Sequence, residues 1–162
     1  MARKKLLLDT NVVVDFLNQR EPEFEQARKL FICGKIGEFS LWISTSQATD
    51  LVYILSDGGK KKAVEQTLAR LREVRTFVNV YPVSASDIDT MLATSWSDPE
   101  DALLVEIALQ IHADAIISSD KDLFKIDAIP VLSPTEFFAS LEENEGITYA
   151  EIPWPPEKQG KG

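Results

Sequence analysis

"KLLLDTNVVVDFL", residues 5–17, has the pattern of a buried strand, a tight turn and a helix. The apolar run of leucines at 6–8 stops at Asp9, and apolar side chains then recur at helical spacing from Val12 to Leu17. A short, continuously apolar strand followed at once by a helix is the unit from which parallel sheets covered on both faces are built. The segment therefore predicts the start of an α/β fold.

The same pattern of strand and helix recurs along the chain. Further strands are predicted within residues 39–44, 75–84 and 113–120, and at the start of 129–143. Helices are predicted at residues 21–37, 45–56, 60–74 and 85–96, from Pro99 onward, and in the rest of 129–143. Short apolar strands alternating with helices predict a three-layer α/β/α fold with a central, mainly parallel sheet.

The length and patterning fit one domain followed by a tail. A chain of 162 residues with 44% hydrophobic residues can bury a single core without disulfide or metal staples. The periodic pattern ends near residue 141, and residues 142–162 gain proline and glycine. We therefore expect a domain over residues 1–141 and a C-terminal tail over 142–162 that is flexible or bound to a partner.

The composition excludes several classes of protein. A formal net charge of -9 argues against a broad basic surface for duplex nucleic acid, so a role with nucleic acid requires metal ions or a local basic patch. Cys33 is the only cysteine, which excludes a disulfide framework and a Cys-rich zinc site. No apolar run approaches the length of a membrane span, and we expect a cytoplasmic protein without a membrane partner.

Two aspartates directly follow predicted strands, Asp9 after "KLLL" and Asp120 after "AIISS". In parallel α/β sheets, ligands collect at the carboxyl ends of the strands, where loops and helix N-termini converge. If both strands lie near the middle of the sheet, the two carboxylates share one edge of it. The alternative is that each aspartate only caps the helix that follows, a role that Asp fills well.

A third carboxylate lies in "SDPEDALLVEIA", residues 97–108. Projected at ~100° per residue, the helix from Pro99 places Asp101 in the middle of its apolar face, where a carboxylate is costly unless it is paired or holds a metal. Asp98 is predicted to be the N-cap and Glu100 to favour the helix dipole. A completed capping interaction between Asp101 and Asp98 is the alternative.

Asp50 lies at the edge of the apolar stripe of helix 45–56 and would be a fourth oxygen donor. Together Asp9, Asp50, Asp101 and Asp120 would make a pocket of oxygen ligands without His or Cys. Hard oxygen ligands suit Mg²⁺ or Mn²⁺, and ions held in such a pocket activate water and stabilise a leaving oxygen. The set therefore predicts metal-assisted hydrolysis of phosphoesters.

These segments resemble the PIN-domain family, nucleases that include the VapC-like toxins of toxin/antitoxin pairs. "LLLDTNVVVDFLNQREP" is similar to the family's opening strand and turn, and "ISTSQATDLVYIL" to its second acidic segment. "DPEDALLVEIALQIHADAIISSDKDLFKIDAIPVLSPTEFF" is similar to its third and fourth acidic segments. The match covers residues 5–141, and the order and spacing of the acidic segments make the combination specific.

By position, the resemblance implies that Asp9 and Asp101 are the principal metal ligands. Asp120 would also hold metal, and Asp50 would complete the catalytic set. The second acidic position is most often Glu in the family, and Asp50 is one methylene shorter. The resemblance thus implies a weaker contribution from Asp50, or one made through water.

Supporting positions follow from the same resemblance. Thr10 or Asn11 would hold a metal-bound water or a neighbouring carboxylate. Asp98, the predicted N-cap, is a supporting residue on the evidence of the helix start and not of the resemblance. Asp122, in "DKDLF", would be an outer member, with a turn residue as the alternative. Many relatives have a basic residue where this chain has Ser119, so one contact to a substrate phosphate is missing by this comparison.

The resemblance implies a ribonuclease that hydrolyses RNA with Mg²⁺ or Mn²⁺, acting as the toxin of a toxin/antitoxin pair. A small antitoxin protein and a homodimer are the implied partners. The alternative is a catalytically weakened RNA-binding or scaffold module with the same fold. A phosphatase of the haloacid-dehalogenase type is a further alternative, although that chemistry requires a second Asp where this chain has Asn11.

Overall fold

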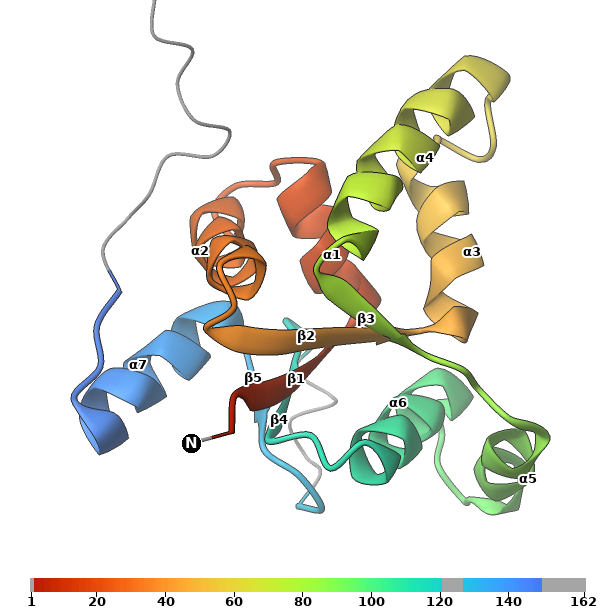
Figure 1. Cartoon of the computed structure of the whole chain (residues 1–162). Helices are drawn as coiled ribbons and strands as arrows, with labels where there is room; N and C mark the ends of the chain where they lie inside the picture. Colours follow the sequence, from red (N-terminus) through yellow and green to blue (C-terminus); the bar gives the residue numbers. More distant parts are fainter. Residues whose placement is uncertain (1, 121–126, 150–162) are drawn as a thin grey trace, which may run out of the picture.

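The structure, a computed structural model, describes residues 2–120 and 127–149. Within them, seven helices surround a five-stranded parallel sheet (Figure 1). The strands are β1 (Lys4–Leu8), β2 (Phe39–Ser44), β3 (Val78–Tyr81), β4 (Ala115–Ile117) and β5 (Val131–Leu132). The helices are α1 (Thr10–Leu17), α2 (Phe24–Lys35), α3 (Thr45–Leu55), α4 (Lys61–Arg75), α5 (Ala85–Ala93), α6 (Pro99–Gln110) and α7 (Pro134–Glu145). The predicted three-layer α/β/α fold is confirmed.

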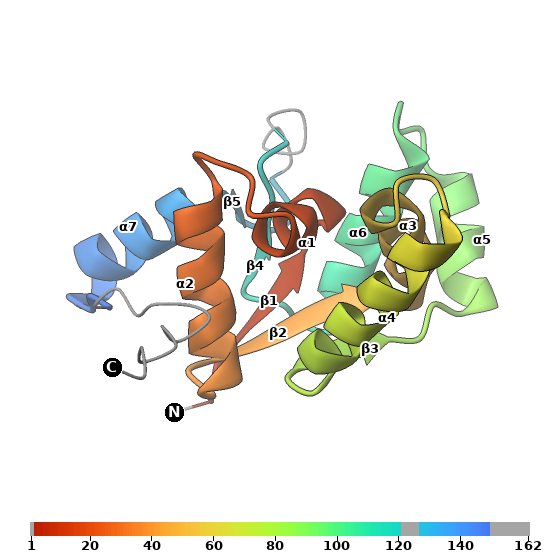
Figure 2. The ribbon, with the colours of Figure 1, turned by 90° about the horizontal axis from the view of Figure 1, so that it is seen from above.

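Strand β1 is buried on both faces. Successive side chains of a strand point to opposite sides, so Leu6 and Leu8 pack into one core with α1, α2 and α7, whereas Leu7 packs into a second core with α6. All three leucines have no exposed surface. Figure 1 shows α1, α2 and α4 on one side of the sheet and α5 and α6 on the other, and Figure 2 shows α1 and α2 from above. The apolar run at 6–8 is therefore a central strand.

The strand order, β3-β2-β1-β4-β5, creates a switch point between β1 and β4. From β1 the chain builds the sheet in one direction through β2 and β3, and then returns to the other side of β1 with β4 and β5. Leu8 pairs with Ile117, so Asp9 and Ser118 emerge side by side at the carboxyl edge. Ligands in open α/β sheets bind in the crevice at such a point.

Helix α5 is shorter than the helix predicted at 85–96. It ends at Ala93, and Thr94 has an extended backbone. The Thr94 hydroxyl donates to the carbonyl oxygen of Met91 at 2.8 Å, a local side-chain bond that competes with continuation of the helix. The residues from Thr94 to Asp98 therefore form the connection that leads into α6.

Helix α7 crosses the predicted domain boundary at residue 141. It continues to Glu145 and ends at Gly146, whose φ of 65° provides the left-handed conformation common after helix ends. Beyond it, the ring of Tyr149 packs against Phe39 with centroids 5.6 Å apart. Described packing thus continues to Tyr149, which lies beyond the boundary expected at residue 141.

The remaining part of the predicted tail, residues 150–162, lies outside the described residues, as does Asp122. Among the helices that are described, none combines the length and the apolar composition needed to cross a membrane.

Candidate active site

Asp9 connects β1 to both the neighbouring strand and the helix that follows. Its N–H donates to the carbonyl oxygen of Ile117 at 2.9 Å, which extends the pairing of β1 with β4. Its carboxylate accepts from the Thr10 N–H and the Ser118 hydroxyl, both at 2.7 Å, and from the Asn11 side-chain amide at 3.3 Å. Asp9 is thus the N-cap of α1, as the alternative reading proposed, and its carboxylate also lies at the switch point.

Burial raises the pKa of the Asp9 carboxyl. The negative charges of Asp120 and Asp98 raise it further, whereas the hydrogen bonds from Ser118 and Thr10 lower it. Burial raises the pKa more than these hydrogen bonds lower it, so the negative charge of the Asp9 carboxylate is only partly stabilised. A cation in front of Asp9 would stabilise it further.

Ser118 and Asn11 connect the start of α1 to the loop that follows β4. The Ser118 hydroxyl donates to Asp9 and accepts from the Asp120 N–H at 3.0 Å. The Asn11 side-chain oxygen accepts from the Ser119 N–H at 3.3 Å. Asn11 therefore holds the neighbouring carboxylate, one of the two functions expected for it. Ser118 was missed by the sequence analysis, and its only signal is its place directly after a buried strand.

The three carboxylates at the start of α6 have different roles. Asp98 is the N-cap, and its carboxylate accepts from the N–H groups of Glu100 and Asp101 at 2.9 and 3.4 Å, with Pro99 in the first turn. This confirms the predicted cap. Asp101 contributes its backbone N–H to the cap, while its carboxylate lines the cleft described below.

The environment of Asp101 is strongly unfavourable for a negative charge. Burial is the largest cause, and the charges of Asp98, Asp120, Asp9 and then Glu100 add to it, so that the pKa rises to about 6. The prediction of an apolar face centred on Asp101 needs correction, because α6 buries side chains around most of its circumference and Asp101 is half-buried at one end.

An open cleft of about 500 Å³ brings the predicted carboxylates together. Its lining comes from the ends of β1 and β4, from α1 and Arg20 beyond it, from α3 and from the start of α6. The acidic side chains that line it are Asp9, Asp50, Asp98, Glu100, Asp101 and Asp120. A smaller cavity of about 160 Å³, lined by residues of α3 and α6, shares Asp9, Asp50 and Asp101 with the cleft. All four carboxylates of the predicted catalytic set therefore line one cleft.

Gln47 holds α3 against the end of β1. Its side-chain oxygen accepts from the Ser44 N–H at 2.8 Å, and its amide nitrogen donates to the Leu8 carbonyl at 2.8 Å and to the Thr10 hydroxyl at 3.3 Å. Asp50 follows three residues later on the same side of the helix. Gln47, which the sequence analysis did not single out, thus fixes the element that carries Asp50.

The donor set fits a hard divalent cation. Carboxylate oxygens are the ligands that Mg²⁺ and Mn²⁺ prefer. Across residues 2–120 and 127–149, no three His, Cys, Asp or Glu side chains lie close enough together to hold one ion jointly. Because Mg²⁺ keeps several waters and is commonly held by one or two carboxylates, the cleft matches an ion bound by few direct ligands.

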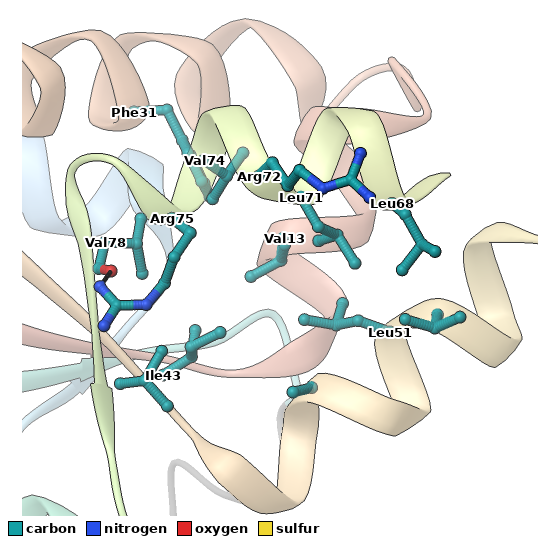
Figure 3. A pocket seen from close by; sticks show the side chains of 13 residues that line it. Val13, Phe31, Ile43, Leu51, Leu68, Leu71, Arg72, Val74, Arg75 and Val78 are labelled. Atoms are coloured by element: carbon teal, nitrogen blue, oxygen red, sulfur yellow. Dashed lines mark hydrogen bonds between the residues drawn. The ribbon is translucent and has the colours of Figure 1, made fainter. Parts of the chain in front are cut away.

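A second cavity, of about 380 Å³, is apolar and lies between α3, α4 and the sheet (Figure 3). Figure 3 shows Leu68 and Leu71 of α4 facing Leu51 of α3 across it. Its charged lining residues are Arg72 and Arg75, and the acidic residues of the cleft are not part of its lining. We call this cavity the apolar groove.

The protein belongs to the class of parallel α/β proteins with carboxylates gathered at the switch point of the sheet. Comparison with known proteins shows which family of that class it is. The family model described as "PIN domain" matches residues 5–122. The chain therefore belongs to the PIN domain family. It is also 28% identical over 145 residues to "Ribonuclease VapC1" of Aquifex aeolicus, which covers 85% of this chain and 95% of that protein.

Solved structures share the fold. A toxin-antitoxin complex from Klebsiella pneumoniae contains a chain with a TM-score of 0.57 and 20% identity, covering 80% of this chain and 97% of that one. VapC20 of Mycobacterium tuberculosis, described as a Sarcin-Ricin loop cleaving toxin, gives a TM-score of 0.58 and 14% identity, covering 74% and 93%. At these identities the likeness concerns the fold alone.

The raised pKa of Asp101 predicts how stability depends on pH without metal. Because the folded state binds this proton more tightly than the unfolded state, the contribution of Asp101 to the free energy of unfolding should fall as pH rises from about 4 to about 6. Asp101→Asn should remove this part of the pH dependence and be more stable at pH 7 by about 1–2 kcal/mol. Urea titrations in EDTA at several pH values measure both effects, and parallel pH curves for the two proteins would contradict them.

Proposed function

We propose that this protein is a metal-dependent endoribonuclease, the toxin of a toxin/antitoxin pair. The observation that carries the proposal is the convergence of Asp9, Asp50, Asp101 and Asp120 on one cleft at the switch point of the sheet. Among the described residues that line the cleft, six are acidic and one, Arg20, is basic, and the substrate of a nuclease is also negative. A bound cation would offset the negative charge of the cleft where the negatively charged RNA binds.

In this proposal Asp9 and Asp101 are the direct ligands of a Mg²⁺ or Mn²⁺ ion, and Asp120 contributes on the side of β4. The chemistry that such an ion supplies is Lewis-acid stabilisation of phosphate oxygens and a lowered pKa of a bound water. Ser118 and Asn11 orient the Asp9 carboxylate through their hydrogen bonds. Asp50, on α3, orients water at the far side of the cleft.

The relatives support the substrate. The similar protein of Aquifex aeolicus is named a ribonuclease, and the structural neighbour from Mycobacterium tuberculosis is described as cleaving the Sarcin-Ricin loop. Asn11 disfavours the phosphatase alternative, because it donates to Asp9 and occupies the position where that chemistry requires a second Asp. The RNA-binding or scaffold alternative keeps the fold and the cleft but lacks turnover.

Cleavage of RNA separates the enzyme from the binding module. Purified protein with Mn²⁺ or Mg²⁺ should cleave single-stranded RNA, and EDTA should stop it. Asp101→Asn should lower the rate by at least about a hundredfold while the protein stays folded, because a ligand of the cation is lost. Asp89→Asn, which changes an exposed carboxylate on α5, is the matched control and should cleave normally. Equal rates for the two variants would contradict the proposed site.

We further propose that a small antitoxin protein binds this chain and that an apolar segment of the antitoxin lies in the apolar groove. The structural neighbour from Klebsiella pneumoniae belongs to a toxin-antitoxin complex. The groove offers apolar surface between α3 and α4, and its arginines favour acidic residues beside the apolar ones. The homodimer that the resemblance implies remains a prediction.

Co-expression with the product of the adjacent reading frame tests the partner. Leu68, 37% exposed, lines the groove, whereas Leu92, 72% exposed, lies on α5 on the other face of the sheet. Leu68→Asp should abolish co-purification of the adjacent product because a charge enters apolar surface, and Leu92→Asp should not. Co-purification that survives Leu68→Asp would place the partner elsewhere.

A further inference from the structure

The acidic cleft contains one arginine. Of the residues that line the cleft in the described part of the chain, six are acidic, and Arg20 is the single cation. Arg20 follows α1, the helix that Asp9 begins, so it comes to the cleft from the opposite end of that helix. A nuclease has to bind a polyanion beside these carboxylates, and Arg20 is placed where such a contact is needed.

The backbone at the end of α1 fixes the position of Arg20. Gln19 has a left-handed φ of 51°, its N–H donates to the Phe16 carbonyl at 3.3 Å, and the Arg20 N–H donates to the Asp15 carbonyl at 3.0 Å. These two bonds form the Schellman motif, in which the residue after the left-handed one is bonded to a residue one and a half turns back. Arg20 is therefore held by the helix end and is not part of a free loop.

The same motif brings the side chains of Arg20 and Asp15 together. Arg20 Nε lies 3.2 Å from Asp15 Oδ1, where Schellman motifs commonly have an apolar contact. The Asp15 side chain is 8% exposed and that of Arg20 is 54% exposed, so a buried anion anchors an accessible cation. Arg20 lowers the pKa of the Asp15 carboxyl, although burial raises it more. More than half of the Arg20 side chain is exposed, so this cation is accessible to a second anion.

We propose that Arg20 binds a phosphate of the RNA strand in the cleft and that Asp15 is its positioning residue. The inference rests on the proposed function. A guanidinium matches two phosphate oxygens at once, and an ion pair that restricts its rotamers reduces the entropy lost on binding. Arg20 would thus place the strand beside the carboxylates that would hold the cation.

A purely structural role for Arg20 would be to neutralise buried Asp15. That role predicts lost stability and no change in how RNA binding depends on salt. A phosphate contact predicts a change in salt dependence, because each neutralised phosphate of a single strand contributes about 0.7 to the slope of log K against log salt. The salt slope therefore separates the two roles.

The test is the binding of a short, labelled single-stranded RNA, measured by fluorescence anisotropy over a series of NaCl concentrations. Ca²⁺ replaces Mg²⁺, and a gel verifies that the RNA stays intact. Arg20→Gln should weaken binding about tenfold and reduce the slope by about 0.7. Arg20→Lys should keep the slope and recover part of the affinity, because the charge remains but the two-bonded geometry is lost.

Two further variants make the result decisive. Arg3→Gln makes the same change at the amino end of β1, away from the cleft, and should bind as the original protein does. If the Arg20→Gln variant unfolds because Asp15 loses its partner, the double variant with Arg20→Gln and Asp15→Asn is measured in its place. The double variant removes both charges of the pair. Equal slopes for the Arg20 and Arg3 variants overturn the inference.

Other outcomes separate this inference from the proposed function. RNA that is bound through Arg20 but not cleaved with Mn²⁺ supports the inference and overturns the enzymatic proposal. Cleavage that is unaffected by Arg20→Gln, with an unchanged salt slope, overturns the inference alone. A protein that neither binds nor cleaves single-stranded RNA overturns both.

Discussion

The structure depends on a partly buried carboxylate, that of Asp9, at the switch point between β1 and β4. Asp9 continues the hydrogen bonding of β1 with β4, caps α1 and accepts from Ser118. One residue thus joins the central strand, its neighbour and the first helix. Its burial raises its pKa, so these connections carry an electrostatic cost that positive charge in the cleft would relieve.

The acidic balance of the chain is compatible with an RNA substrate on this account. Asp9, Asp101 and Asp120 repel one another within the cleft, and Asp101 has a pKa of about 6 as a result of burial and these neighbours. Bound cations would reverse the local charge, and Arg20 adds a fixed positive group at the same cleft. The apolar groove is separate from this cleft, which leaves it available for a protein partner.

Features that depend on local sequence were predictable, whereas features that depend on strand pairing were not. The Asp98 cap follows from Asp-Pro before a helix, and the strands follow from short apolar runs. Asp9 and Asp120 were placed at one edge by the general topology of parallel sheets. Ser118 and Arg20 act through contacts that only the strand register and the helix end create. Gln47 belongs to a capping box with Ser44, which is a local pattern, but its bond to the end of β1 depends on the tertiary fold. The domain boundary expected at residue 141 falls inside α7, because "EENE", residues 142–145, is polar yet helical.

The central claim is that the cleft carboxylates bind a divalent cation, and calorimetric titration with Mn²⁺ at pH 7 tests it most directly. The account predicts saturable binding that is lost or weakened at least about tenfold in Asp9→Asn and Asp101→Asn. Asp89→Asn, an exposed site on α5, should bind Mn²⁺ as the original protein does. Unchanged Mn²⁺ affinity in both cleft variants would contradict the account.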